Sequence, residues 1–204
     1  MAKNKTQSHS KIAEAAKNEF LEYGFMDASM RRIAAASGIT VSGLYKHHKN
    51  KEEMFASLVD PVLKEMWDSY ERIEKREFEE IEDPDPEHIW EGKLECQMIM
   101  GFIYDHYDVF RLLICKSQGT RYEHLSHELA VREEATTLAY MEKLRKKGIP
   151  IHEVNPKEFH LLVTTCIDAI LEAVRHEFSR EEAMHYADTL ELFYEQGWKK
   201  YFGY

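Results

Sequence analysis

Apolar residues recur at every third or fourth position along almost the whole 204-residue chain, and this spacing constrains the fold more than any other feature. Phe55, Val59 and Leu63 form one such run, and Phe159 and Val163 begin another. This is the spacing of one face of an α-helix. No stretch alternates convincingly between apolar and polar residues, as a half-buried strand would. The sequence therefore predicts an all-α fold.

Glycine and proline residues lie between these runs and mark where helices end and begin. They predict about nine helices, over residues 8–23, 29–36, 40–47, 51–80, 87–105, 107–116, 121–147, 156–178 and 180–202. Pro61 falls inside the fourth of these ranges. Because proline lacks an amide donor and clashes with the preceding turn, it predicts either a bend just before Pro61 or a break into two helices.

The composition excludes several classes of protein. Hydrophobic residues make up 44% of the chain, enough to bury a core, which excludes a disordered protein. The most apolar stretches, 98–104 and 161–174, are too short or too charged for a membrane span, and residues 1–17 lack the apolar stretch of a signal peptide. Cys96, Cys115 and Cys166 are widely separated, which argues against a disulfide framework. We expect a cytoplasmic protein with no membrane partner.

Charge is distributed unevenly along the chain. The net charge is −10, which at first argues against binding to nucleic acid. Residues 1–51, however, carry nine basic and four acidic residues, a net charge of +5. Residues 52–204 carry 18 basic and 33 acidic residues, a net charge of −15. This pattern is typical of a basic module that meets a polyanion and an acidic body, although chance variation in surface charge remains an alternative.

Residues 29–45 read as two short helices joined by a turn, the pattern of a helix-turn-helix. Ser29 and Thr40 are placed to cap the two helices with their side-chain oxygens, and Gly38 can adopt the left-handed conformation that ends the first helix. Ile33 and Leu44 supply apolar contacts that fix the helices against each other. This arrangement presents the 40–47 helix outward, towards a DNA major groove.

The residues on and beside that helix suit DNA. Small residues at its start allow close approach to bases and phosphates, and cationic or aromatic residues follow. The predicted DNA-binding residues are Ser29, Arg31, Arg32, Thr40, Val41, Ser42, Gly43, Tyr45, Lys46, His47 and Lys51. For any single lysine, a solvated surface charge is the simpler interpretation, but not for the whole group.

Residues 8–55 resemble the DNA-binding headpiece of TetR/AcrR-type transcriptional regulators. The resemblance rests on Ala13, Phe20, Gly24, Phe25, Ile33, Ala34, Ser37, Gly38, Ile39, Gly43, Leu44, Tyr45, His47, Lys49, Asn50, Lys51, Glu52, Glu53, Met54 and Phe55. It covers about a quarter of the chain. His48 departs from the family, which commonly has an apolar residue there; it could loosen the packing or contact a phosphate.

The resemblance implies specific roles. The 40–47 helix would enter the major groove, Val41, Ser42 and Gly43 would lie where base contacts are made, and Tyr45, Lys51 and Ser29 would contact the DNA backbone. Arg31 would read a base or a phosphate. It also implies a DNA-binding domain over residues 1–51 and a helical ligand-binding and dimerisation domain over 52–204.

The segment 161–174 supports a homodimer independently, because it is apolar on more than one face. Together with the 180–202 helix it would form a hairpin, and two hairpins would make a four-helix interface. The expected interface residues are Leu162, Ile167, Ile170, Val174, Leu190, Tyr194 and Trp198. A central helix of a monomer is the alternative.

Methionine and aromatic residues on the middle helices could line a cavity for a small-molecule effector. The expected ligand-binding residues are Met66, Trp67, Tyr70, Met98, Phe102, Phe110 and Met141, with plain core packing as the alternative for each. Asp168 interrupts an apolar run and would suit a cationic ligand, but its spacing with Thr165, Glu172 and Arg175 favours a hydrogen-bonded surface or dimer stripe.

Catalytic and metal sites are not indicated. His124, His127 and Glu128 share a helix face, but no further metal ligand is identifiable, and no phosphate-binding loop, nucleophile elbow or zinc-protease motif occurs. We expect no cofactor, no metal and no enzymatic activity. The sequence predicts a ligand-responsive, homodimeric transcriptional repressor on a pseudo-palindromic double-stranded operator. The alternatives are a helical small-molecule-binding protein that no longer binds DNA and, less favoured, an enzyme.

Overall fold

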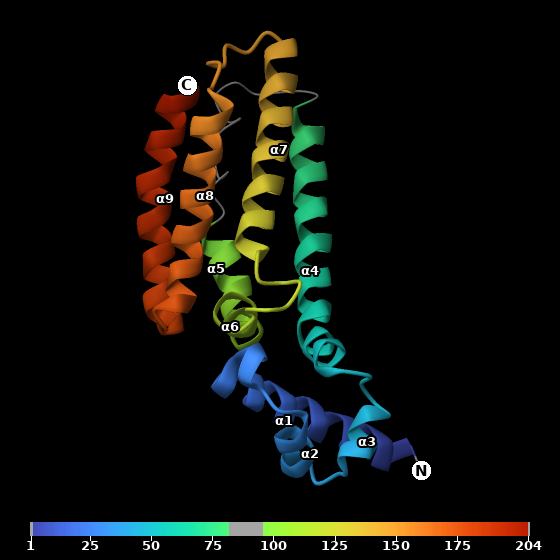
Figure 1. The fold of residues 1–204 in the computed structure, drawn as a ribbon. Helices are drawn as coiled ribbons and strands as arrows, with labels where there is room; N and C mark the ends of the chain where they lie inside the picture. Colours follow the sequence, from blue (N-terminus) through green and yellow to red (C-terminus); the bar gives the residue numbers. More distant parts are fainter. Residues whose placement is uncertain (1, 82–95, 204) are drawn as a thin grey trace. The chain divides into compact units, whose positions relative to one another are not determined.

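The computed structural model describes residues 2–81 and 96–203, with side chains from residue 9 onward, and this part of the chain is helical without a strand. Its helices are α1 (Ala2–Asp27), α2 (Met30–Ser37), α3 (Val41–Tyr45), α4 (Lys51–Glu80), α5 (Cys96–Asp105), α6 (Tyr107–Cys115), α7 (Leu125–Lys146), α8 (Pro156–Arg175) and α9 (Arg180–Phe202) (Figure 1). The expected all-α fold, with an N-terminal helix-turn-helix and a helical C-terminal part, is confirmed.

The predicted helix ends are close to the observed ones, with informative differences. The first helix begins at Ala2 and continues past residue 23, although Gly24 inside it has non-helical angles (φ 72°, ψ 170°). The first residues of the predicted 87–105 helix lie outside the described residues, and the remainder is α5. The α4 helix is a single helix with Pro61 inside it, so the alternative of two separate helices is wrong.

The chain divides into two compact units. The first contains the residues up to Met66 together with His106–Glu123, and the second contains Trp67–Asp105 and His124–Tyr204. The α4 helix contributes to both units, and α6 belongs with the N-terminal helices. The division expected between residues 51 and 52 therefore falls inside the first unit.

An aromatic cluster forms the core of the first unit. The ring of Phe55, from α4, lies 5.1 Å from that of Phe20 and 5.6 Å from that of Phe25, both at steep angles. The centre of the Tyr122 ring lies 5.8 Å from that of Phe55. Edge-to-face contacts of this kind add to the gain from burying the rings. Helix α6 packs on α1, where the Lys17 ammonium lies 2.6 Å from an Asp108 carboxylate oxygen.

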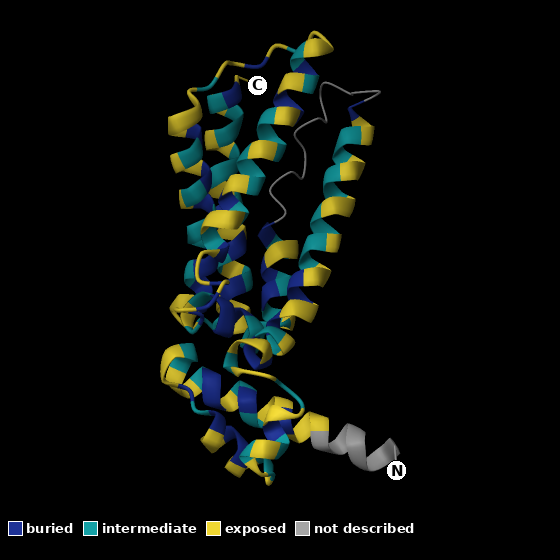
Figure 2. Cartoon of the chain, turned by 45° about the vertical axis from the view of Figure 1, so that its right-hand side comes forward, coloured by how far each residue is buried: buried dark blue, intermediate teal, exposed yellow. Residues whose placement is uncertain are grey.

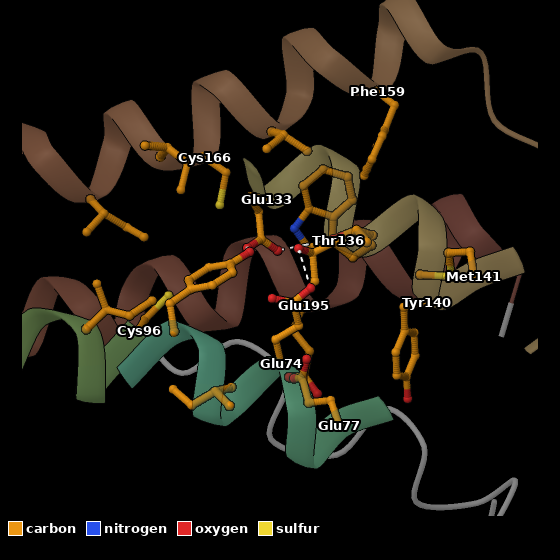
Figure 3. A pocket seen from close by; sticks show the side chains of 18 of the residues that line it. Glu74, Glu77, Cys96, Glu133, Thr136, Tyr140, Met141, Phe159, Cys166 and Glu195 are labelled. Atoms are coloured by element: carbon orange, nitrogen blue, oxygen red, sulfur yellow. Dashed lines mark hydrogen bonds between the residues drawn. The ribbon is translucent and has the colours of Figure 1, made fainter. Parts of the chain in front are cut away.

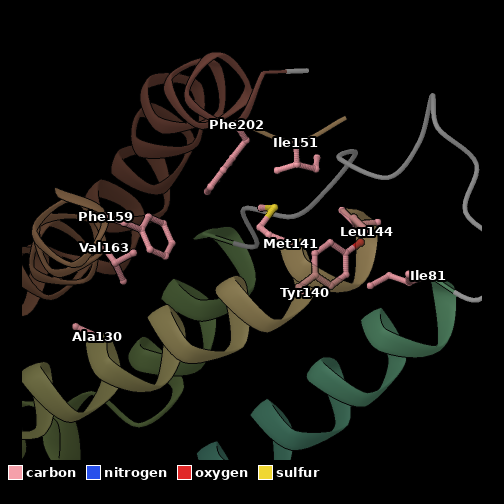
Figure 4. Packing of buried hydrophobic residues seen from close by; sticks show 9 residues of the cluster. All are labelled: Ile81, Ala130, Tyr140, Met141, Leu144, Ile151, Phe159, Val163 and Phe202. Atoms are coloured by element: carbon pink, nitrogen blue, oxygen red, sulfur yellow. The ribbon is translucent and has the colours of Figure 1, made fainter. Parts of the chain in front are cut away.

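The second unit is built around the packed faces of α7, α8 and α9. Its core contains Ile81, Ala130, Tyr140, Met141, Leu144, Ile151, Phe159, Val163 and Phe202, whose side chains turn towards a common interior (Figure 4). Buried positions follow the three- or four-residue spacing of the sequence, so burial is one-sided along each helix (Figure 2). Helices α8 and α9 begin at side-chain caps, from Asn155 and from a reciprocal pair formed by Ser179 and Glu182.

None of the helices within the described ranges is long and apolar enough to cross a membrane.

Substitution by alanine should change the free energy of unfolding in opposite directions at two glycines that both have room for a methyl group. Gly38 has left-handed angles (φ 72°), whereas Gly101 lies inside α5, and neither added Cβ would meet an atom within 4 Å. Gly38→Ala should cost about 1 kcal/mol of unfolding free energy because of backbone strain. Gly101→Ala should gain about 0.5–1 kcal/mol because alanine favours the helix. Urea titration followed by circular dichroism measures both changes, and a shift of the same sign would contradict the assignment of these backbone conformations.

Candidate functional site

Helix α3 begins at a well-formed cap and exposes most of its remaining surface. The Gly43 amide donates to the Thr40 hydroxyl oxygen at 3.0 Å, so the expected cap is confirmed. Leu44 is the buried residue of α3 and anchors it. Ser42 is exposed, and Tyr45 keeps 47% of its surface exposed. A short helix is thereby held on one side with its polar side open for contact.

Helix α2 packs beneath α3 and ends as expected. Gly38 adopts left-handed angles, and its amide and that of Ile39 return to carbonyls of the last helical turn. The Ser37 hydroxyl donates to the Ile33 carbonyl at 2.7 Å. Ile33 and Ala34 are buried against the neighbouring helices.

The start of α2 differs from the prediction. The Ser29 hydroxyl makes no capping hydrogen bond to α2, so the expected side-chain cap is wrong. The Ser29 backbone amide instead donates to the Glu19 carboxylate at 2.7 Å. Glu19, on α1, is only 8% exposed. A carboxylate from the preceding helix therefore fixes the start of α2, where sequence reasoning expected the hydroxyl.

The exposed Arg32 side chain pairs with the buried Glu19 carboxylate. Its Nε donates to Glu19 at 2.8 Å, and one of its terminal nitrogens donates to the Asp27 carbonyl at 2.8 Å. Its guanidinium also lies 4.2 Å from the centre of the Tyr23 ring. The hydrogen bond to Glu19 raises the pKa of Arg32. The Arg32 side chain, predicted to contact DNA, is thus bound within its own unit.

Lys51 is also bound to its own unit. Its ammonium donates to the carbonyls of Met26 at 2.8 Å and Ala28 at 3.2 Å, and it lies 4.6 Å from the centre of the Phe25 ring. These contacts fix the start of α4 against the end of α1. An ammonium has three donors, so one N–H remains for a phosphate.

The other predicted DNA-binding side chains lie on the surface of the first unit. Arg31, Ser42, Tyr45 and Lys46 are exposed. Val41, Gly43 and His47 are partly exposed. The structure therefore brings the predicted base-reading positions together on α3.

Histidines lie at the edge of this surface. The rings of His9 and His47 meet edge to face, with centres 4.6 Å apart. Burial lowers the pKa of His48 below its ordinary value of 6.5, so His48 is mostly neutral at pH 7. The departure from the family at this position therefore adds a half-buried neutral ring rather than a cation.

The second unit contains a cavity of about 270 Å³. Its lining comes from α4, α5, α7, α8 and α9, and Figure 3 shows the side chains around it. The lining residues are Tyr70, Ile73, Glu74, Glu77, Cys96, Met98, Ile99, Glu133, Thr136, Thr137, Tyr140, Met141, Phe159, Val163, Cys166, Ile167, Ile170, Glu195, Trp198 and Phe202. Such a mostly apolar space with a few polar groups is typical of a small-molecule site.

The predicted ligand-binding residues divide into two groups. Tyr70, Met98 and Met141 line the cavity. Met66 and Phe110 belong to the first unit, where Phe110 is buried in the core, and neither Trp67 nor Phe102 lines the cavity. The sequence does not reveal the α8 and α9 walls, because the periodicity of apolar residues such as Phe159 and Val163 is the same for a cavity wall as for solid core.

The two cavity thiols are held in the protonated form. Burial raises the pKa of the Cys96 thiol to about 11 and that of Cys166 to about 12. Thiolates are the reactive form of cysteine. Cys96 and Cys166 therefore act as small apolar groups of the wall.

The residues expected at a dimer interface also divide. Ile170, Val174 and Leu190 are buried within their own unit, so their side chains offer no surface to a partner. Leu162 is 41% exposed, and Ile167, Tyr194 and Trp198 are partly exposed. The most exposed apolar residues of α8 and α9 are Leu161, Leu192 and Phe193, which the prediction omitted.

Asp168 does not line the cavity. Its carboxylate accepts the Ser126 hydroxyl at 2.7 Å, and a terminal nitrogen of Arg175 lies 3.5 Å away. This is the hydrogen-bonded stripe favoured by the sequence, and Asp168 is not a buried counter-charge for a ligand.

Residues 12–58 match the family model for bacterial regulatory proteins of the tetR family. This segment contains the caps, the turn and the exposed helix described above. Residues 12–58 therefore carry the N-terminal DNA-binding region typical of the tetR family. No curated protein matches the sequence of this chain.

Solved structures of transcriptional regulators share the fold of this chain along most of its length. PfmR from Thermus thermophilus is 20% identical, with a TM-score of 0.53, over 88% of this chain and 96% of that one. NalD, the secondary repressor of the MexAB-OprM multidrug efflux pump in Pseudomonas aeruginosa, is 16% identical, with a TM-score of 0.55, over 92% and 95%. FadR from Bacillus subtilis, solved in complex with stearoyl-CoA, is 13% identical, with a TM-score of 0.52, over 89% and 97%.

Alanine substitutions at two adjacent arginines of α2 should have different effects on stability, because Arg32 has a structural role and Arg31 does not. Arg32→Ala should lower the urea midpoint of unfolding, because it leaves the buried Glu19 carboxylate without its cation. Arg31→Ala should leave the midpoint unchanged, since the equally exposed Arg31 side chain pairs with no buried carboxylate among the described residues. Equal midpoints for the two variants would contradict the structural role of Arg32.

Proposed function

We propose that this protein is a DNA-binding transcriptional repressor of the tetR family that a small molecule releases from its operator. The observation that carries the proposal is the exposed polar side of α3, with Ser42, Tyr45 and Lys46, inside the segment that matches the family model. A helix held from behind, with small residues at its N-terminal end, suits the major groove. No catalytic role is proposed for it.

The distribution of charge supports contact with DNA through the N-terminal residues. Residues 1–51 carry a net charge of +5, and the rest of the chain carries −15. Cations near the phosphates release counterions and make binding strongly salt-dependent, whereas the acidic remainder is repelled. Binding to an operator places the protein in the cytoplasm.

The cavity of the second unit supports a ligand-responsive mechanism. A ligand that binds one conformation better than another shifts the population towards it. The α4 helix runs from the DNA-binding unit into the cavity wall, where Tyr70 and Glu74 lie. We therefore assign α4 as the connection through which an effector changes the fit to DNA.

Exposed apolar residues on α8 and α9 support a homodimer. Leu161 is 65% exposed, and Phe193 is 74% exposed. Large apolar side chains exposed together mark contact surfaces. Two copies of α3 are also needed to read the two half-sites of a pseudo-palindrome, about 34 Å apart.

Selection from random DNA duplexes with the full-length protein tests DNA binding. It should enrich an inverted repeat, and the affinity should fall steeply with salt. Tyr45→Ala and Lys46→Ala should each weaken binding about fivefold to tenfold across sequences, whereas changes at Ser42 should alter base preference. Lys146→Ala, a matched loss of an exposed lysine on α7, should have no effect.

Failure to enrich any palindrome at low salt would overturn the proposal that the protein is a repressor. Ligand binding without such enrichment would favour the second candidate, a small-molecule-binding protein that no longer binds DNA, which the cavity alone supports.

The dimer can be tested at Phe193. Phe193→Asp should convert the protein to a monomer in sedimentation velocity and should abolish tight operator binding, because a charge replaces an exposed apolar contact. Val131→Asp places the same charge at another exposed apolar position, on α7, and should leave the dimer intact. A dimer that survives Phe193→Asp would place the interface elsewhere.

A further inference from the structure

The cavity of the second unit has aromatic walls from several helices. Tyr70 comes from α4, Tyr140 from α7, Phe159 from α8, and Trp198 and Phe202 from α9. The Phe159 ring lies 5.9 Å from that of Trp198 and 5.8 Å from that of Phe202, with steep angles between them. Rings set at different angles present both faces and edges to the space between them. Faces of aromatic rings attract cations.

Among the described residues, the charged ones that line this apolar space are all acidic. They are Glu74 and Glu77 on α4, Glu133 on α7 and Glu195 on α9. No lysine, arginine or histidine lines the cavity within the described residues. Figure 3 shows Glu133 and Glu74 beside Thr136, whose hydroxyl donates to Glu74 at 3.4 Å.

Cations outside the cavity partly balance two of these carboxylates. Arg132 has a terminal nitrogen 3.3 Å from Glu74, and the Lys199 ammonium lies 2.6 Å from Glu195. Glu133 is different, because its neighbours are hydroxyl groups. The Tyr70 hydroxyl donates to one of its oxygens at 2.8 Å, and the Thr137 hydroxyl donates to the other at 3.1 Å. Across the described residues, Glu133 forms no ion pair.

Tyr70 remains a donor to Glu133. Burial, and then the charge of Glu133, raise the pKa of the Tyr70 hydroxyl well above its ordinary value, so it stays protonated. Two neutral hydroxyl groups orient the carboxylate without cancelling its charge. An ionised carboxylate has about four lone-pair sites, so it can accept a further donor or face a cation.

We infer that the cavity binds an organic cation with an apolar body. The charged head lies by Glu133 and the α4 carboxylates, and the apolar body lies among Phe159, Val163 and Trp198. Glu133 is partly buried, so its charge is incompletely solvated, and a ligand cation supplies the partner that the two hydroxyl groups do not. A fatty carboxylate of similar size would meet the same carboxylates with like charge. The binding stands by itself, whereas the role of this ligand as the effector rests on the proposed function.

Three ligands with ten-carbon chains separate the contribution of head-group charge from that of apolar burial. They are decyltrimethylammonium, decanol and decanoate, each titrated into the full-length protein below its aggregation limit and followed by calorimetry and thermal shift. The cation should bind about tenfold more tightly than the alcohol, as expected for one ion pair with aromatic support. Decanoate should bind more weakly than the alcohol. Equal binding of all three, or preference for decanoate, would overturn the inference.

Variants locate the head group. Glu133→Gln keeps the shape of the side chain and an acceptor but removes the charge. It should therefore lower the affinity for the cation about fivefold and leave the affinity for decanol unchanged. Glu128→Gln, on the exposed side of the same helix, should change neither of these two affinities. If Glu133→Gln fails to fold, Glu195→Gln, on α9, removes a second cavity charge, with the exposed Glu181→Gln as its control. A folded cavity variant that loses affinity for cation and alcohol equally would overturn the assignment of the head group.

The two proposals can fail separately. Tight, Glu133-dependent binding of the cation with no selected palindrome would support the proposed cationic ligand and would contradict the proposed repressor function. A selected palindrome with no preference for the cation would do the reverse. With both intact, decyltrimethylammonium should release the selected duplex from the wild-type protein at a lower concentration than from Glu133→Gln.

Discussion

A buried carboxylate in α1 holds the DNA-binding unit in its arrangement. Glu19 accepts the Ser29 amide at the start of α2 and the Arg32 side chain one turn later, so it fixes both the position and the direction of α2. The turn at Gly38 and the cap at Thr40 then set where α3 begins. Because a buried charge is tolerated only when fully bonded, this network favours one orientation of the surface offered to DNA.

The second unit has acidic side chains around an apolar cavity, and these carboxylates need partners. Hydroxyl donors hold Glu133, and cations outside the wall balance Glu74 and Glu195. The thiols of Cys96 and Cys166 stay neutral because they are buried. The unit is therefore stable with a cavity whose charge selects among ligands of similar size and apolar surface.

Local features of the fold could be read from the sequence. The periodicity of apolar residues predicted the helices, and the residue types at positions 38 and 40 predicted the Gly38 turn and the Thr40 cap, because these features depend on neighbours within one or two turns. The roles of Ser29 and Arg32 could not be read this way. Both depend on Glu19, which lies 10 and 13 positions earlier in the chain. The family resemblance located the surface of α3, yet the fixed position of Lys51 against α1 also needed the structure.

The sequence by itself determined an all-helical chain with a basic helix-turn-helix and an acidic remainder. Only the tertiary structure decided which apolar residues enclose a cavity and which form solid core. Phe159 and Phe110 sit in equally apolar runs, but one borders the cavity and the other packs inside the first unit. The physical reason is that periodicity identifies which face of a helix is buried, whereas the neighbour against which that face packs depends on contacts between residues far apart in the chain.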